Sequence, residues 1–437
     1  MFAAAIVLAF VGATVVDGTG APPIRDAVVV VQDGRIAAVG PRSAVAIPPG
    51  AERVDVAGRF LIPGLTDMHV HFPPAAPGEA APGAIALWVL QNLIAYGVTT
   101  AKESGFYAAD ARPLKADLDR GALPGPHLFT SGQTINGDAA RQQFLEDVGD
   151  ARTAVRRSLS FGADFIKIHN FVGPSALDAI VDEAQQNGLR VTGHVPLSLT
   201  MALAVDRGLY GLEHIRVRPE EVLDDPAIAA RYPISLPVQK RELFWQYVDV
   251  NAAKPRALVD DLRRQTVYLD PTLVADEVTA RHDAAKARIA ALPLPDAVAG
   301  TWRKDRYVEG LTAEDKAAWE PALKARLAFA AAAFRAGVLV TAGTDAYIPY
   351  VYPGESLHRE LALLVEAGLS PIDAIRCAGA NAARALGHPG EFGAIVKGAR
   401  ADLVVLSADP AASIANTRAI VAVYKDGRQV SATPPRR

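Results

Sequence analysis

The sequence predicts an α/β protein, a (β/α)8 (TIM) barrel that carries a small β-sandwich domain formed by both chain ends. Between residues 58 and 393, short apolar runs alternate with longer helical stretches, a pattern typical of strand–helix units around a parallel sheet. Short β-like runs separated by turn residues occupy both ends, and 437 residues exceed one ordinary domain. We therefore expect a β-sandwich of residues 1–57 and 394–437 and a barrel of residues 58–393.

The chain ends have the pattern of paired strands. Apolar runs at residues 8–16, 27–31 and 35–39 are separated by turn residues, and Asp33-Gly34 between two such runs is a strong hairpin signal. The same pattern returns at residues 401–406 and 420–424, before Asp426-Gly427. Both ends are therefore expected to contribute strands to one small domain.

Eight short runs in the middle of the chain have the length and composition of barrel strands. Helical intervals such as residues 175–187, which end at Gly188, separate these runs. Two longer intervals, residues 216–265 and 271–335, are expected to form lids or substrate walls. The expected strands are residues 65–71, 98–103, 127–131, 165–169, 190–194, 211–214, 267–269 and 338–341.

The composition favours small-molecule partners. Half of the residues are apolar and the net charge is −3, so a large core can be buried and no basic field is present to hold nucleic acid. We also expect no membrane partner, because no long uninterrupted apolar stretch predicts a spanning helix; a homo-oligomer is left open. The single cysteine, Cys377, fits a reducing compartment. A cytoplasmic location is expected, with a trimmed export signal before Leu8 as the alternative.

His69 and His71 are the first candidates for chemistry. Residues two apart on a strand point to the same face, so their imidazoles lie side by side as metal chelators. A single His-x-His pair is weak evidence, because such motifs often arise by chance. Later strands supply partners at their carboxyl ends, where barrel enzymes hold their catalytic groups. These partners are Lys167, His194, His214 and Asp345, after the fourth, fifth, sixth and eighth strands.

This order of residues resembles the amidohydrolase superfamily of metal-dependent hydrolases, which have His-x-His after the first strand and an aspartate after the eighth. The resemblance covers nearly the whole chain and includes the motifs at residues 62–71 and 397–406. Residues 353–361 are most similar to the branch of imidazolonepropionase-related amidohydrolases and prolidase-like dipeptidases.

The resemblance implies a binuclear metal centre. Lys167 would be carboxylated, and its carbamate would bridge two divalent ions that share a hydroxide as the nucleophile. Asp345 would serve as ligand and as general acid/base. Imidazole and carboxylate ligands suit zinc, with manganese, cobalt or iron as substitutes. The implied ligands are His69, His71 and Asp345 for one ion, His194 and His214 for the other, and Lys167 for both.

Substrate contacts are predicted from residues near the strand ends, each with a structural role as its alternative. His169 shares a strand face with Lys167, and paired arginines can clamp a carboxylate. Tyrosines after Asp345 can form an aromatic wall. Together these residues suggest an amide with an acidic end and an apolar or aromatic end. The candidates are His169, Arg216, Arg218, Tyr347, Tyr350, Tyr352 and His358.

Two segments depart from the family pattern. Residues 131–138 lack the Gly-Gly-His element of prolidase-like relatives, which weakens a dipeptidase assignment without touching the metal ligands. Lys102-Glu103 stands where Arg-Asp is usual. His127, at the start of the third strand, lies at the opposite end of the barrel and is expected to be structural.

We therefore predict a binuclear metal-dependent hydrolase that cleaves an amide or peptide-like C–N bond, in a dipeptide or an N-acyl amino acid. The same centre also suits an esterase, a lactonase or a phosphotriesterase. A mononuclear deaminase or cyclic amidine hydrolase is a further alternative, although such relatives generally lack the fourth-strand lysine. A non-enzymatic scaffold would be expected to have lost ligands, and all six are present. The sequence does not identify the substrate, because specificity lies in loops.

Overall fold

The computed structural model describes residues 7–303 and 305–431. Most of the apolar prefix that was considered as an export signal therefore lies outside the described residues. Within the described residues, no helix combines the length and the apolar character needed to cross a membrane.

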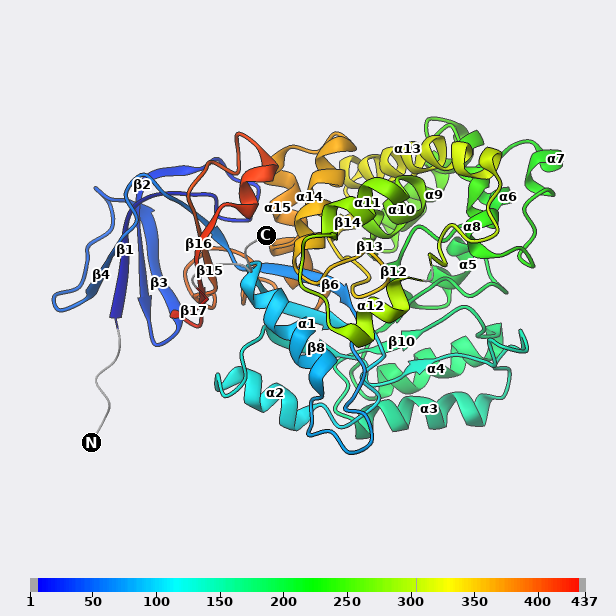
Figure 1. The fold of residues 1–437 in the computed structure, drawn as a ribbon, viewed down its shortest axis with the longest axis horizontal. Helices are drawn as coiled ribbons and strands as arrows, with labels where there is room; N and C mark the ends of the chain where they lie inside the picture. Colours follow the sequence, from blue (N-terminus) through cyan, green and yellow to red (C-terminus); the bar gives the residue numbers. More distant parts are fainter. Residues whose placement is uncertain (1–6, 304, 432–437) are drawn as a thin grey trace.

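One mixed sheet contains strands from both chain ends, which lie side by side at one end of the molecule (Figure 1). Its order is β17-β16-β15-β5-β1-β2-β3, with β4 paired to β1. Gln32 pairs with Arg35 across the predicted Asp33-Gly34 turn, which confirms that hairpin. The strands are β1 Val7–Val15, β2 Ile24–Gln32, β3 Arg35–Pro41, β4 Glu52–Asp55, β5 Phe60–Pro63, β15 Leu403–Leu406, β16 Ile420–Lys425 and β17 Arg428–Ser431.

Both faces of this terminal sheet bury apolar side chains. Phe10 and Val29 belong to a cluster on one face, whereas their neighbours Ala9 and Val28 belong to a separate cluster. Because successive residues of a strand point to opposite faces, this alternation is what a sheet covered on both sides requires. Strand β5, beyond the expected boundary at residue 57, joins the sheet by pairing with β1 and β15.

The middle of the chain forms parallel strands in the order of the sequence, and all eight expected strands are present. They form a three-stranded sheet, β6-β7-β8, and a six-stranded sheet, β14-β13-β12-β11-β10-β9. The short β9 was not predicted. The strands are β6 Leu65–Val70, β7 Val98–Glu103, β8 His127–Thr130, β9 Thr134–Ile135, β10 Ile166–Ile168, β11 Val191–Gly193, β12 Leu209–Glu213, β13 Tyr268–Asp270 and β14 Leu339–Val340.

Backbone hydrogen bonds link the two parallel sheets at both of their edges. The amide of Met68 in β6 donates to the carbonyl of Ala342, just after β14, over 3.0 Å. At the other edge, the amide of Asp164 donates to the carbonyl of Thr130 in β8 over 2.8 Å. The carboxyl ends of the parallel strands therefore face a common region.

Helices fill the connections, and the two long intervals that were expected to form lids or substrate walls also contain helices. The helix α13 is fixed at its ends by a Thr312–Asp315 capping box and by Gly337 in a left-handed conformation. The helices are α1 Ala84–Ala95, α2 Arg112–Asp119, α3 Val148–Ser160, α4 Pro174–Gln186, α5 Met201–Asp206, α6 Pro219–Val222, α7 Pro226–Ala229, α8 Val238–Arg241, α9 Ala253–Arg264, α10 Leu273–Ala280, α11 His282–Ile289, α12 Asp296–Trp302, α13 Ala313–Ala336, α14 Glu355–Glu366, α15 Pro371–Cys377 and α16 Ala380–Ala385, with 3-10 turns η1 Glu242–Tyr247 and η2 Ile414–Arg418.

His358 is a buried part of this scaffold. Its Nε2 donates to the carbonyl of Tyr96 over 3.0 Å, and its Nδ1 lies 2.9 Å from the hydroxyl of Thr417. Both ring nitrogens of this substrate candidate therefore already have partners in the fold. Burial, with the nearby charge of Arg418, lowers the pKa of His358 to about 3.

This pKa predicts acid sensitivity. Between pH 6.5 and 3 the unfolded chain binds a proton that folded His358 does not, so stability falls as the pH drops, by at most about 1.4 kcal/mol per pH unit. In urea unfolding at pH 4.5 to 6, His358→Gln should lose less stability per pH unit than the wild type. Equal slopes for His358→Gln and the wild type would contradict the assignment.

Candidate metal centre

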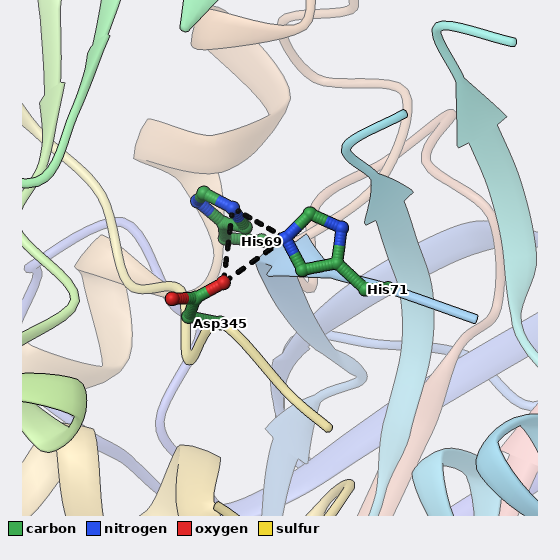
Figure 2. A group of neighbouring side chains, drawn as sticks. All are labelled: His69, His71 and Asp345. Atoms are coloured by element: carbon green, nitrogen blue, oxygen red, sulfur yellow. Dashed lines mark hydrogen bonds and ion pairs between the residues drawn. The ribbon is translucent and has the colours of Figure 1, made fainter. Parts of the chain in front are cut away.

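His69, His71 and Asp345 bring three ligand atoms together at the end of β6 (Figure 2). The two Nε2 atoms are 3.0 Å apart, and Asp345 Oδ1 lies 3.4 Å from His69 Nε2 and 3.0 Å from His71 Nε2. Ligands about 2.0–2.2 Å from one zinc ion are separated by roughly 3.0–3.6 Å, depending on the coordination number, so this spacing fits a single ion. The donor set of two imidazoles and one carboxylate suits the same ion.

Asp67 fixes the backbone that carries this group. One carboxylate oxygen accepts from the amides of His69 and Thr344, over 3.1 and 3.0 Å, and the other accepts from the Thr344 hydroxyl over 2.7 Å. The Asp345 amide also donates to the His69 carbonyl over 2.8 Å. Burial raises the pKa of Asp67 to about 7, although these hydrogen bonds oppose the shift. Asp67 thus ties β6 to the segment after β14.

Lys167 lies in β10 with its side chain fully buried, and its ammonium forms an ion pair with Glu213. Lys102 in β7 binds the other carboxylate oxygen of Glu213 and is equally buried. Burial, reinforced by the charge of Lys102, lowers the pKa of Lys167 well below its usual value. Sequence reasoning missed Glu213, although a glutamate in the apolar segment 209–213 was a signal of the same kind as Lys167.

His194 and His214 follow β11 and β12, and each is held through its Nδ1 atom. His194 Nδ1 lies 2.9 Å from Asn170 Oδ1, and His214 Nδ1 is bonded to the Thr272 hydroxyl. Such partners orient metal-binding histidines and leave Nε2 free for the ion. The centres of the two imidazole rings are 4.7 Å apart, and His214 Nε2 is 3.9 Å from Asp345 Oδ2. Burial lowers the pKa of both histidines, which favours the neutral form that binds metals.

Three residues at this site have left-handed backbone conformations. His214, Thr272 and Asp345 have φ angles of 62°, 48° and 66°. Residues other than glycine rarely adopt such angles, and they cluster at functional sites. The backbone conformation therefore indicates a functional site at these three residues, independently of what their side chains contact.

Of the predicted substrate residues, His169 and Arg216 lie near the candidate metal ligands, whereas Arg218 is bonded to the backbone. The His169 ring lies 3.9 Å from that of His194, and burial lowers the pKa of His169 to about 3. Arg216 donates to Glu242 over 3.1 Å, whereas Arg218 donates to the Leu197 carbonyl over 2.9 Å. The charge of Arg216 contributes to the lowered pKa of His214, which shows that Arg216 lies near the histidines.

The tyrosines after Asp345 mainly support the loop. Tyr350 donates to the Trp302 carbonyl over 2.8 Å and also contacts Asp305, while Tyr352 donates to Asn92 over 2.9 Å. Tyr347 packs against Trp88, with ring centres 6.2 Å apart.

Sequence reasoning missed two aromatic residues beside the centre. Phe106 stacks on His71 with ring centres 4.2 Å apart, yet 54% of its surface is exposed. Tyr307 lies near Asp345, since burial and the Asp345 charge together raise the pKa of Tyr307 to about 12. The exposed Phe106 follows a predicted strand end, which was the available signal.

Residues 60–430 match the sequence model of the Amidohydrolase family. The chain belongs to the amidohydrolase family. This confirms the predicted resemblance, and it makes the chain an enzyme of the hydrolase class. The curated ochratoxinase of Aspergillus niger is 23% identical over 476 aligned positions, which cover 93% of this chain and 83% of that protein. Imidazolonepropionase of Rhizobium rhizogenes is 49% identical over 53 residues, 12% of this chain and 13% of that one.

Solved amidohydrolases share the fold. A Xaa-Pro dipeptidase with bound methionine matches with a TM-score of 0.70 and 20% identity, covering 97% of this chain and 99% of that one. The A. niger ochratoxinase structure matches with a TM-score of 0.68 and 20% identity, covering 98% and 96%. These neighbours imply a TIM-barrel type of fold for the amidohydrolase described above.

Gly193 directly precedes His194, and its backbone conformation determines where the chain places that histidine. Gly193 has a φ of 140°, and a Cβ there would overlap the carbonyl of Ile168. Gly188 also has a positive φ, 73°, but a Cβ there would meet nothing within 4 Å. Gly193→Ala should therefore lose roughly 2 kcal/mol more unfolding free energy than Gly188→Ala, together with bound metal. Equal losses of unfolding free energy in the two variants, measured in urea, would contradict this prediction, because they would show that β11 accommodates a Cβ at Gly193 without strain.

Proposed function

We propose that this amidohydrolase is a binuclear metal-dependent hydrolase of amide or peptide-like C–N bonds. The observation that supports the proposal is the grouping of His69, His71 and Asp345. His194 and His214 lie beside this group, and Lys167 is buried among the same parallel strands. Dipeptides and N-acyl amino acids are the proposed substrates. Metal use is general in this family, and small-molecule amides and peptides are consistent with the names of its similar members.

The proposed scaffold is a closed (β/α)8 barrel of residues 58–393 with a β-sandwich of residues 1–57 and 394–437. The hydrogen bonds from Met68 to Ala342 and from Asp164 to Thr130 support closure, because they join β6 to the segment after β14 and β8 to the segment before β10. In a closed barrel, the ligands would converge on one mouth.

Two divalent ions, with zinc preferred, would be held in this mouth. His69, His71 and Asp345 would hold one ion, His194 and His214 would hold the other, and Lys167 would bridge them as its carbamate. When bound, the ions would polarise the substrate carbonyl and lower the pKa of the attacking water.

The burial of Lys167 suits its carboxylation. A buried lysine with a lowered pKa has a neutral amine available to attack carbon dioxide, forming an N–C bond and releasing one proton. The product is an anion next to the Glu213 carboxylate. Lys102 is already paired with Glu213, so the positive charge that balances the carbamate would come from the bound metal ions.

Asp345 is placed for proton transfer. Its Oδ1 faces His69 and His71, while its Oδ2 faces His214. From this position the carboxylate can accept a proton from the attacking water and give it to the leaving amine. No serine or cysteine nucleophile is needed for this reaction, and the buried Cys377 belongs to α15.

The surroundings favour a substrate with an acidic end and an apolar end. Arg216, Arg241 and Arg326 surround Glu242, and Arg326 also binds Asp276, so three cations face two carboxylates. This excess of positive charge suits a substrate carboxylate. A cavity of about 380 Å³ beside Asn170, lined by Phe144 and Phe171, offers an apolar surface near His194.

Lys167→Ala tests the bridge. The variant should lose at least one bound ion per chain and about 10²-fold or more in turnover, because the ions would lose their shared ligand. Metal content is measured by mass spectrometry, and turnover on a panel of Xaa-Pro dipeptides, N-acyl amino acids, lactones and phosphotriesters. Substrates that end in a free carboxylate should react faster than their amidated forms.

Two controls keep this result interpretable. Lys324→Ala replaces a lysine with an exposed side chain on α13 and should keep both metal and activity. Added acetate or propionate should partly restore Lys167→Ala, since a small carboxylate can take the place of the carbamate. Full activity with two ions in Lys167→Ala would contradict the bridge, and turnover of lactones or phosphotriesters alone would contradict the C–N bond assignment.

A further inference from the structure

A second group of metal-type side chains lies at the amino end of β8, away from the candidate metal centre. His127 is the first residue of β8, Asp402 precedes β15, and Asp426 lies in the turn between β16 and β17. Each offers one ligand atom, and these atoms all lie within 4.8 Å of one another. The group therefore joins the parallel strands to the terminal sheet.

The spacing of this group suits an ion better than direct hydrogen bonds. His127 Nε2 lies 3.4 Å from Asp426 Oδ2 and 3.6 Å from Asp402 Oδ2, beyond the usual N–H···O range. Ligands of a tetrahedral ion at 2.0–2.1 Å are separated by roughly 3.4 Å. Within the described residues, His127 Nε2 and Asp402 Oδ2 are buried without a hydrogen-bond partner. Their side chains are only 7% and 2% exposed, so bulk water does not easily supply the missing hydrogen bonds.

Neighbouring contacts orient these ligand atoms. Asp119 Oδ1 lies 2.8 Å from His127 Nδ1, the carboxylate partner that metal-binding histidines typically have on their other nitrogen. Asp402 Oδ1 accepts from the amide of Asp426 over 2.8 Å, so Oδ2 is left to face His127. Each supporting bond uses the atom that the ion would not need.

The local charge also calls for a cation. Three carboxylates, those of Asp119, Asp402 and Asp426, surround His127. Lys425 lies nearby, but its ammonium donates to the carbonyls of Leu118 and Gly125 over 2.7 and 3.2 Å. The cations that act on these three carboxylates are Lys425 and Arg400. With His127 neutral, as a metal ligand must be, one negative charge is left at a buried site, which is costly without a further cation.

We infer that His127, Asp402 and Asp426 bind a divalent transition-metal ion such as Zn²⁺, which fastens β8 to the terminal sheet. Asp119 and Asp426 line a surface cavity of about 810 Å³, which gives the ion a path from solvent and room for a water ligand. This structural site does not depend on the proposed hydrolytic function.

The test compares Asp426→Asn with Asp33→Asn in the full-length, zinc-loaded protein. Asp33 has an exposed side chain and lines the same cavity, but it is not one of the three ligands. After dialysis against Zn²⁺, Asp426→Asn should contain one zinc ion fewer per chain than the wild type and Asp33→Asn. Its turnover should be unchanged, and its melting temperature should rise less with added Zn²⁺.

Anomalous diffraction at the zinc edge then locates the ion. The expected result is a peak between His127, Asp402 and Asp426 in the wild type and none there in Asp426→Asn. Asp402→Asn should behave likewise; if this more buried variant does not fold, Asp426→Asn decides, because the Asp426 side chain is 38% exposed. Equal zinc content in Asp426→Asn and the wild type, or no peak at His127, overturns the inference.

Discussion

The candidate centre depends on how the protein buries charge among its parallel strands. Glu213 lies inside the structure with Lys102 on one carboxylate oxygen and Lys167 on the other. Removing one partner of such a buried pair typically costs several kcal/mol, because it leaves a charge unpaired in a low dielectric. Lys102 and Glu213 therefore hold each other in place, and with them the ends of β7 and β12, while Lys167 in β10 lies directly beside Glu213. Since His214 directly follows Glu213, the same charge arrangement positions a candidate ligand.

Backbone geometry adds a second constraint at the same place. The left-handed conformations of His214 and Asp345 turn the chain sharply at the ends of strands, and hydrogen bonds hold both turns. The His214 amide donates to the Asp270 carbonyl, and the Asp345 amide donates to the His69 carbonyl, both over 2.8 Å. Such strain persists only where the surroundings determine the conformation. The ligands are thus fixed by neighbouring strands rather than by flexible loops.

These constraints explain which features were predictable from the sequence. The eight predicted strands follow from short apolar runs, and the candidate ligands are His, Lys or Asp residues at or just after the ends of five of these runs, a pattern that is local in the sequence. The pairing of Lys102 with Glu213 joins strands 111 residues apart, and no local pattern indicates it. The partners of His358, Tyr350 and Arg218 likewise depend on tertiary packing. His127 was expected only to be structural for the same reason. Asp402 and Asp426 are far from it in the sequence and come close only when the terminal sheet packs against β8.

The central claim is that metal held at the carboxyl ends of the parallel strands drives amide hydrolysis. The most direct measurement is turnover of an N-acyl amino acid during titration of chelator-treated protein with Zn²⁺. Asp426→Asn is the suitable background, because it removes the proposed structural ion from the count. The account predicts no turnover without metal and full turnover at two ions per chain. Hydrolysis at an unchanged rate by the metal-free protein would contradict it.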